Sequence, residues 1–423
     1  MENSAENQLK NSEKIPYEYS ENKSSINRGF LIFAVISFIF TLIFIFTDLE
    51  IQIQNAFFDA TAPQEERFIY ADSEPWHFLY EQEGAILISV ALFALILIFT
   101  SWVNGKKKPV GRYGWYIITV ALVGTGLIVN AIFKGYWGRP RPREVYPYDP
   151  NGYEYHPVWW PHFKQVLANL AAVNDGEAIR DALGNSSFSA GHPTEAIVLI
   201  ALFMVLSHPE VMVHFTKNVR KSTKILFSAL FVVFLSAFLA GIVLINKDYT
   251  DTNAQILAAG FLGSIIFASL LSLFRIPPKH RIKIINIFKY IALGISVVGG
   301  ILMGIGRAVQ FGHWPSDSLW SFIFVYMSAY VLYYYVFDFP TYEKEWLKKW
   351  KDPSYEMKPC RPIWAGMVIF LGVLAYVVST IWFVEYSIRP DIFQLELIAG
   401  IVLDIGFTVA IYFAIRSLNS YKK

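Results

Sequence analysis

Residues 291–337 decide the fold: two apolar runs, IALGISVVGGILMGI (291–305) and LWSFIFVYMSAYVLYYYVF (319–337), flank the polar stretch GRAVQFGHWPSD (306–317). A helix needs about 20 mostly apolar residues to cross a lipid bilayer, and the two runs approach that length. Arginine, histidine and aspartate are costly in or beside hydrocarbon, so they mark functional positions there. The pattern predicts two transmembrane helices joined by a functional turn at a membrane surface.

The composition of the whole chain is that of a membrane protein. Of its 423 residues, 54% are hydrophobic and only 17% are charged, whereas soluble domains carry about 25% charged residues. The net charge of +2 gives no indication of a nucleic-acid partner, and none is expected. The single cysteine, Cys360, excludes an internal disulfide and a cysteine-rich metal site. Residues 1–28 are polar, so we expect no amino-terminal signal peptide.

Apolar stretches of about 20 residues predict an all-α protein, a polytopic membrane helix bundle with about ten transmembrane helices. The predicted spans are 29–47, 85–103, 114–134, 193–208, 224–245, 253–274, 284–305, 316–337, 363–384 and 394–415.

The distribution of lysine and arginine predicts the orientation of these spans, because basic residues concentrate in cytoplasmic loops. With the amino terminus in the cytoplasm, 25 of the 36 basic residues fall on the cytoplasmic side. Both termini are therefore predicted to be cytoplasmic, and the long loops 48–84 and 135–192 to lie outside. Basic residues in 135–192 run against this trend. Either long loops cross the membrane whatever their charge, or these residues have a function there.

Three polar clusters fall on the outer face in this topology: KGYWGRPRPREVYP (134–147), NSSFSAGHPTEA (185–196) and GRAVQFGHWPSD (306–317). Together they supply Lys134, Arg139, Arg141, His192, Arg307, His313 and Asp317. Arginine binds phosphate oxygens with two parallel hydrogen bonds, and lysine adds a point charge. The combination predicts a phosphate-binding site on the non-cytoplasmic side.

The two histidines are predicted to stand just before helices. Pro193 follows His192, Pro315 lies two residues after His313, and proline favours the first position of a helix. The unpaired N–H groups at a helix start favour an anion. His313 and Asp317 are four residues apart, so the carboxylate can orient the imidazole as a nucleophile or general base requires. Taken alone, either histidine is more often an ordinary helix cap.

The three clusters resemble the signature of the type 2 phosphatidic acid phosphatase superfamily of membrane phosphatases. The matching segments are Lys134-x6-Arg141-Pro142, Gly191-His192 and Arg307-x5-His313-x3-Asp317. The run VQFGHWPSD looks closest to the bacterial lipid A phosphatases of that superfamily.

The resemblance also implies how the chain is divided. A phosphatase core of about six helices would occupy residues 29–337, with an inserted helical hairpin at about 224–275. The remaining parts would be a cytoplasmic polar tail (1–28), a cytoplasmic basic loop (338–362) and a C-terminal pair of transmembrane helices with a short tail (363–423).

The catalytic roles implied by the resemblance fall on three residues. His313 would attack phosphorus and form a phosphohistidine, and Asp317 would hold His313. His192 would protonate the leaving oxygen and later activate water. No metal and no cofactor is implied.

The phosphate-binding roles implied by the resemblance fall on Lys134, Arg141 and Arg307, with help from the backbone amide of Gly191. Two positions depart from the family pattern. The second cluster has Ser189-Ala190 where the family usually has proline and serine, and the third opens with Gly306 where a serine is usual. The first change removes a hydroxyl that would donate to phosphate, and Ser187 or Ser189 is a candidate to replace it.

We therefore expect an integral-membrane lipid phosphatase in the bacterial inner membrane, with its site on the periplasmic side. Its substrate would be a lipid A-type, isoprenoid or glycerophospholipid phosphate, and its protein partners stay open. A lipid phosphotransferase with the same site, and a transporter or binding protein without hydrolase activity, are the alternatives. The polar clusters gather at one face and no internal repeat is evident, which does not favour a transporter. Asp404 falls within a span, where it has either a function or a hydrogen-bond partner on a neighbouring helix.

Overall fold

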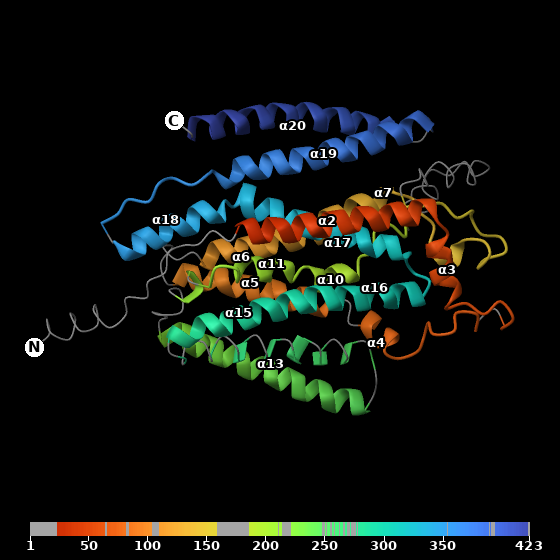
Figure 1. The fold of residues 1–423 in the computed structure, drawn as a ribbon, viewed down its shortest axis with the longest axis horizontal. Helices are drawn as coiled ribbons and strands as arrows, with labels where there is room; N and C mark the ends of the chain where they lie inside the picture. The colour runs from red at the N-terminus through yellow and green to blue at the C-terminus, as the bar shows by residue number, and fades with distance from the viewer. Residues whose placement is uncertain are drawn as a thin grey trace, which may run out of the picture.

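The computed structural model describes residues 23–421, apart from residues 64–65, 82–83, 104–109, 159–185, 210, 214–220, 353, 389, 391–393 and parts of 248–277. Most of the predicted tail (1–28) and much of the predicted span 253–274 lie outside the described residues. Within them the chain is helical, and the β contacts are isolated bridges from Phe58 to Phe68 and from Val145 to Tyr153. The long helices run side by side along one axis (Figure 1). The predicted helical membrane bundle is confirmed.

Seven helices in the described residues are long and apolar enough to cross a membrane. They are Ile26–Phe46, Val110–Tyr136, Phe227–Lys247, His280–Val309, Pro315–Val336, Ile363–Ser387 and Gln394–Ser420. Two other predicted spans are shorter apolar helices, Ile86–Trp102 and Pro193–Val205. Most of the second is buried among other helices, where a continuous helix of full membrane length is not required. The predicted count of about ten is therefore not confirmed.

The first half of the chain contains α2 (Lys23–Phe46), α3 (Leu49–Asn55), α4 (Trp76–Glu81), α5 (Ala85–Val103), α6 (Val110–Thr119), η1 (Val120–Phe133), α7 (Lys134–Tyr136), η2 (Pro142–Glu144), α10 (Pro193–Ile197) and α11 (Ile200–Val205). The second half contains α13 (Lys221–Lys247), α15 (Pro278–Gly294), η3 (Ile295–Gly299), α16 (Gly300–Val309), α17 (Pro315–Val331), η4 (Leu332–Val336), α18 (Phe339–Lys351), α19 (Ile363–Ile388) and α20 (Gln394–Tyr421).

The core of the bundle lies where the continuous helix α6–η1–α7 packs against α17. Buried residues make up 50% of the apolar window of the first helix and 56% of the second, against 6% for α13 and 11% for α20. The two central helices approach closely at Gly124, where an added Cβ would lie 3.4 Å from Cβ of Ser328. Small residues permit such contacts in membranes. The outer helices expose their apolar side chains, as helices in contact with lipid do.

The C-terminal helices α19 and α20 form a pair at the edge of the bundle (Figure 1). Helix α19 contacts η4, and α20 packs chiefly against α19. Asp404 of α20 accepts a hydrogen bond of 2.6 Å from the hydroxyl of Ser379 on α19. This bond gives the intramembrane carboxylate a partner on the neighbouring helix, which is one of the two alternatives expected from the sequence.

The polar clusters gather at one end of the bundle. Helices α3, α4 and α7 and the turn before α17 lie at that end, whereas α18, the start of α2 and the end of α20 lie at the other (Figure 1). This arrangement is the one expected if both termini are on the same side of the membrane and the clusters on the opposite side. Which side is cytoplasmic stays a prediction from the charge distribution.

A cysteine-accessibility experiment tests this sidedness. In a Cys360→Ser background, Tyr146→Cys places a thiol on an exposed residue at the cluster end, and Lys344→Cys places one on an exposed residue of α18. We expect a membrane-impermeant maleimide added to intact cells to label the Tyr146→Cys variant and to label Lys344→Cys only after the membrane is opened. Labelling of both variants in intact cells, or the reverse pattern, would refute the predicted orientation.

Candidate active site

The turn between α16 and α17 brings Arg307 close to His313. Helix α16 closes with a Schellman motif, in which the N–H of Gly312 donates to the Arg307 carbonyl (3.0 Å) and that of Phe311 to the Ala308 carbonyl (2.9 Å). The N–H of His313 also donates to the Arg307 carbonyl, at 3.2 Å. Phe311 has a φ of 52°, in the left-handed region where glycine is usual. Its fully buried ring packs against Phe58, Phe68 and Tyr148.

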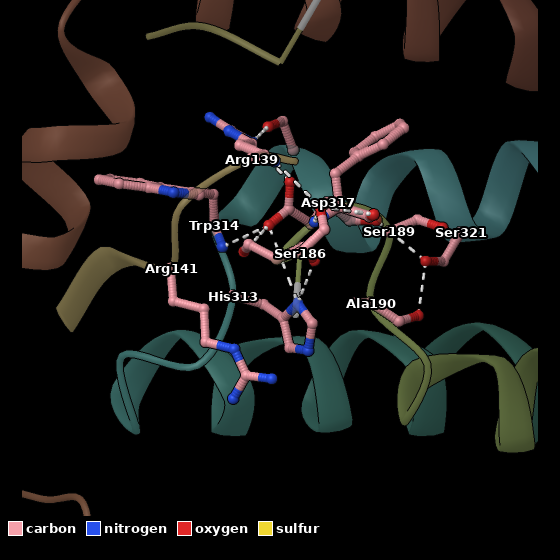
Figure 2. A network of polar contacts seen from close by, with 12 residues as sticks. Arg139, Arg141, Ser186, Ser189, Ala190, His313, Trp314, Asp317 and Ser321 are labelled. Carbon is pink, nitrogen blue, oxygen red and sulfur yellow. Dashed lines mark hydrogen bonds and ion pairs between the residues drawn. The ribbon is translucent and has the colours of Figure 1, made fainter. Parts of the chain in front are cut away.

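His313 is held through one ring nitrogen by a backbone carbonyl. Its side chain is buried, and Nδ1 lies 2.5 Å from the carbonyl oxygen of Ser187. Because a carbonyl can only accept, Nδ1 carries the proton and Nε2 keeps its lone pair. In Figure 2 the free edge of the ring points away from Asp317, to the side on which the guanidinium of Arg141 lies. The geometry therefore leaves a neutral ring nitrogen with its lone pair on that side.

Asp317 lies beside His313 without a direct hydrogen bond to it. Its Oδ2 is 3.8 Å from Nδ1 of His313. The carboxylate instead accepts hydrogen bonds from the Trp314 N–H (2.9 Å), the Ser187 hydroxyl (2.5 Å) and the Arg139 guanidinium (2.5 Å). Because these three donors occupy the carboxylate, the expected hold of Asp317 on His313 passes through Ser187. The hydroxyl of that serine contacts one residue and its carbonyl the other.

Two further buried charged residues, Arg139 and Glu50, are linked to Asp317 by hydrogen bonds. The sequence grouped Arg139 with the cations of a phosphate-binding site, but its side chain is buried and does not line the cavity described below. It donates to Oδ1 of Asp317 from Nη1 and to Oε2 of Glu50 from Nη2 (2.8 Å). Glu50 was not identified from the sequence at all. It also accepts from the Ser316 N–H and the Tyr155 hydroxyl, each at 2.9 Å. Glu50, Arg139 and Asp317 are each at most 1% exposed, so they form a buried chain of alternating charges.

The serines of the second cluster point into the protein. The hydroxyl of Ser187 donates to Asp317, and that of Ser189 donates to the Val129 carbonyl at 3.3 Å. Ala190 contributes its carbonyl, which accepts from the Ser321 hydroxyl at 2.7 Å (Figure 2). In this arrangement neither serine replaces the hydroxyl that the family usually directs at phosphate.

Tyr80 of α4 contacts both His192 and Arg307. Its ring is stacked on the imidazole of His192, with centroids 5.1 Å apart and planes 19° from parallel. The guanidinium of Arg307 lies 4.7 Å from the same ring centroid and donates to Gln310 Oε1 at 2.8 Å. One aromatic side chain therefore sets the distance between a proposed acid–base group and a proposed phosphate-binding group. Sequence reasoning missed it, because α4 lies in a polar loop without a periodic pattern.

A cavity of about 400 Å³ opens beside these residues. Arg141, Arg143, Arg307, Tyr80 and His77 line it, together with four other residues. Within the part of the chain that the structure describes, no group of three or more His, Cys, Asp or Glu side chains is arranged to hold a metal ion. The three guanidinium groups outweigh the one carboxylate of the lining, Asp72, and suit the cavity to an anion.

Lys134 and Gly191 complete the set of predicted residues. Lys134 forms the first residue of α7, at the cavity end of the bundle, and its charge acts on His313. Gly191 immediately precedes His192 and lies against Asn130. A Cβ at this position would lie 2.7 Å from Oδ1 of Asn130, so a larger residue would displace that side chain.

The surroundings of His313 keep its ring neutral. Burial lowers the pKa of His313 to about 4, and the charges of Arg307 and Lys134 act in the same direction, although Asp317 opposes them. Burial alone would lower the pKa of Arg139, but Asp317 and Glu50 outweigh this effect and raise it, so Arg139 stays charged. The site thus combines a neutral imidazole with fixed cations.

Comparison with known proteins adds one relative. Over 113 residues the chain is 33% identical to the lipid A 4'-phosphatase of Francisella tularensis subsp. novicida (strain U112). The match covers 26% of this chain and 49% of that protein, so the chain spans about half the length of the curated relative it matches. No model of a known protein family and no solved structure matches the chain. The similarity to a phosphatase is in line with a site suited to phosphate.

Proposed function

We propose that this protein is an integral-membrane lipid phosphatase of the type 2 phosphatidic acid phosphatase superfamily. It would remove a phosphate from a lipid on the non-cytoplasmic face through a phosphohistidine. The observation that carries the proposal is the state of His313: Nδ1 donates to a carbonyl, Nε2 keeps its lone pair, and arginines line the adjacent cavity. A neutral imidazole beside fixed cations suits attack on a phosphoryl group.

The proposed reaction has two steps. In the first, Nε2 of His313 bonds to phosphorus, the bond from phosphorus to the lipid oxygen breaks, and His192 gives that oxygen a proton. In the second, His192 takes a proton from water, whose oxygen attacks phosphorus and releases His313 and inorganic phosphate. The phosphorylated ring is cationic, because Nδ1 keeps its proton. The Ser187 carbonyl and the charge of Asp317 stabilise it.

The phosphoryl oxygens would be bound by Lys134, Arg141 and Arg307, with the Gly191 amide in support. Arg141 and Arg307 already line the cavity, so these two groups need little reorganisation as charge develops. No metal ion is required for either step. Lipid A-type, isoprenoid and glycerophospholipid phosphates all offer the same phosphoryl group. A lipid phosphotransferase would use the same first step with a lipid hydroxyl in place of water.

The membrane location rests on the seven apolar helices, and the phosphatase assignment on the site and the lipid A 4'-phosphatase similarity. We further propose that the protein lies in the inner membrane, with a periplasmic site and cytoplasmic termini. We also propose the division into a core at 29–337 with an inserted hairpin near 224–275, a basic loop at 338–362 and a helix pair at 363–423.

Phosphate release by purified protein in detergent tests the function. We expect release from at least one of lipid A, undecaprenyl pyrophosphate, phosphatidylglycerophosphate and phosphatidate, unchanged by a chelator. His313→Asn should abolish release, because no other group replaces a covalent nucleophile, while the thermal unfolding midpoint shows that the variant is folded. Substantial release by folded His313→Asn would exclude His313 as the nucleophile, and loss of release with chelator would exclude a metal-free reaction.

The pH dependence of kcat/KM follows from the neutral state of His313. The nucleophile is the unprotonated ring of His313, so activity is lost as the pH falls through the pKa that His313 has in the folded protein. Since that pKa is lowered to about 4, we expect the acid limb to lie well below the ordinary histidine value of about 6.5. An acid limb at or above that value, measured on the stable pH range of the protein, would contradict a buried neutral His313.

The contact of Tyr80 with His192 and Arg307 predicts a difference between two substitutions. Tyr80→Phe keeps the ring and should change kcat/KM by less than about twofold. Tyr80→Ala removes a stacked pair and a cation–π contact, each of about 1 kcal/mol, and should lower kcat/KM by about tenfold or more. Equal activity of the two variants would mean that the ring does not position the site.

A further inference from the structure

Glu50, Arg139 and Asp317 form a chain of charges, of which the proposed reaction uses Asp317 but neither Glu50 nor Arg139. Arg139 bonds to Glu50 at 2.8 Å and to Asp317 at 2.5 Å. All three side chains are at most 1% exposed, and neither Glu50 nor Arg139 lines the cavity. A buried charge is costly unless it is paired and hydrogen-bonded. Two residues this deeply buried, both on loops or short helices at the site end, therefore need a reason.

Glu50 holds two segments of the site at once. One carboxylate oxygen accepts the N–H of Ser316, in the first turn of α17, at 2.9 Å. The other accepts from Arg139, which also donates to the hydroxyl of Ser316 at 2.8 Å. Glu50 and Arg139 are thus bonded to the start of α17, the helix that carries Asp317. A shift of either side chain would therefore move Asp317.

Asp317 is the member of the chain whose charge acts directly on His313. Two carboxylates and one guanidinium leave one negative charge beside the ring. The positive charge of Arg139 weakens the effect of the Asp317 carboxylate on the ring. The negative charge of Glu50 compensates that of Arg139. The other charged groups around the ring are cations: Arg307 on α16 and Lys134 on α7, whose charges oppose that of Asp317, and Arg141, whose guanidinium lies on the side to which the free edge of the ring points.

We infer that Glu50 and Arg139 are positioning residues for His313, because they fix Asp317 and set the negative charge that stabilises the phosphorylated ring. This inference rests on the proposed function. Attack on phosphorus converts a neutral ring into a cation, so the transition state gains from every negative charge nearby. Without the charge of Glu50, Arg139 would neutralise Asp317 and the cationic ring would lose that stabilisation.

Three variants separate charge from structure. Glu50→Gln keeps the size and the acceptor for Ser316 but removes the negative charge. The double variant Glu50→Gln with Arg139→Gln removes both charges, so the net charge returns to that of the natural protein. Glu50→Asp keeps the charge and shortens the side chain, and it serves as the control for geometry.

We expect Glu50→Gln to lower kcat about tenfold, with KM within about twofold because neither residue lines the cavity. Its acid limb should move about one pH unit lower, because a less negative site disfavours the protonated ring. The double variant should recover much of the lost kcat and return the limb to its original position. Glu50→Asp should leave the limb in place. Thermal unfolding midpoints identify which variants are folded.

A structural role alone gives the opposite pattern. If the double variant is slower than Glu50→Gln and all limbs coincide, the charge chain does not act on His313. If the double variant fails to fold, Glu50→Asp decides the question. An acid limb that shifts as far in Glu50→Asp as in Glu50→Gln overturns the inference.

An activity-independent readout separates this inference from the proposed function. The ring nitrogens of His313 are followed by NMR of ¹⁵N-histidine-labelled protein in detergent from pH 2 to 7, a range that covers both expected midpoints, with His313→Asn giving the assignment. If natural protein releases no phosphate from any lipid, the proposed function fails, whereas a titration that shifts between natural protein and Glu50→Gln still supports the charge effect. Identical titrations of His313 in all variants overturn the inference, whatever the activity.

Discussion

The rest of the site depends on the hydrogen bonds that the buried carboxylate of Asp317 accepts. This carboxylate joins residues from all three polar clusters: Arg139 from the first, Ser187 from the second and the Trp314 N–H from the third. A carboxylate removed from water costs several kcal/mol unless its oxygens are fully hydrogen-bonded. The three clusters, far apart in sequence, must therefore assemble around it when the helices pack. The same assembly leaves the carbonyl of Ser187 in position to hold His313.

The helix bundle supplies the rigid support for this carboxylate. Helix α17 packs along η1, and the starts of α10 and α17 bring His192 and Asp317 to the same end of the bundle. Membrane helices hydrogen-bond their own backbone, so irregular segments are confined to places where protein covers them. The site lies in such segments, at the ends of helices and in the turns between them. The rigid helices hold the site in position, and the polar groups of the site lie where protein covers them.

The sequence predicted the parts of this structure that leave a pattern of residue types. Hydropathy predicted the long helices, and the spacing from Arg307 to His313 reflects the Schellman turn that brings them together. It did not predict that Ser187 holds His313 with its carbonyl, because every residue has one. Glu50 and Tyr80 were missed because they lie in the predicted loop 48–84, where the contacts of the short helices α3 and α4 are set by tertiary packing. Nor does hydropathy reveal that the predicted span 193–208 is divided into α10 and α11, since buried and lipid-facing apolar residues look alike.

The covalent role of His313 is the central claim, and trapping the phosphorylated protein tests it most directly. Folded His192→Asn, which lacks the group that activates water, is mixed with a ³²P-labelled lipid phosphate and quenched in alkali. The account predicts a label that survives alkali, is lost in acid as phosphohistidine is, and maps to His313 by mass spectrometry. A label on another residue, or turnover by this variant with no trapped species at any time, would contradict it.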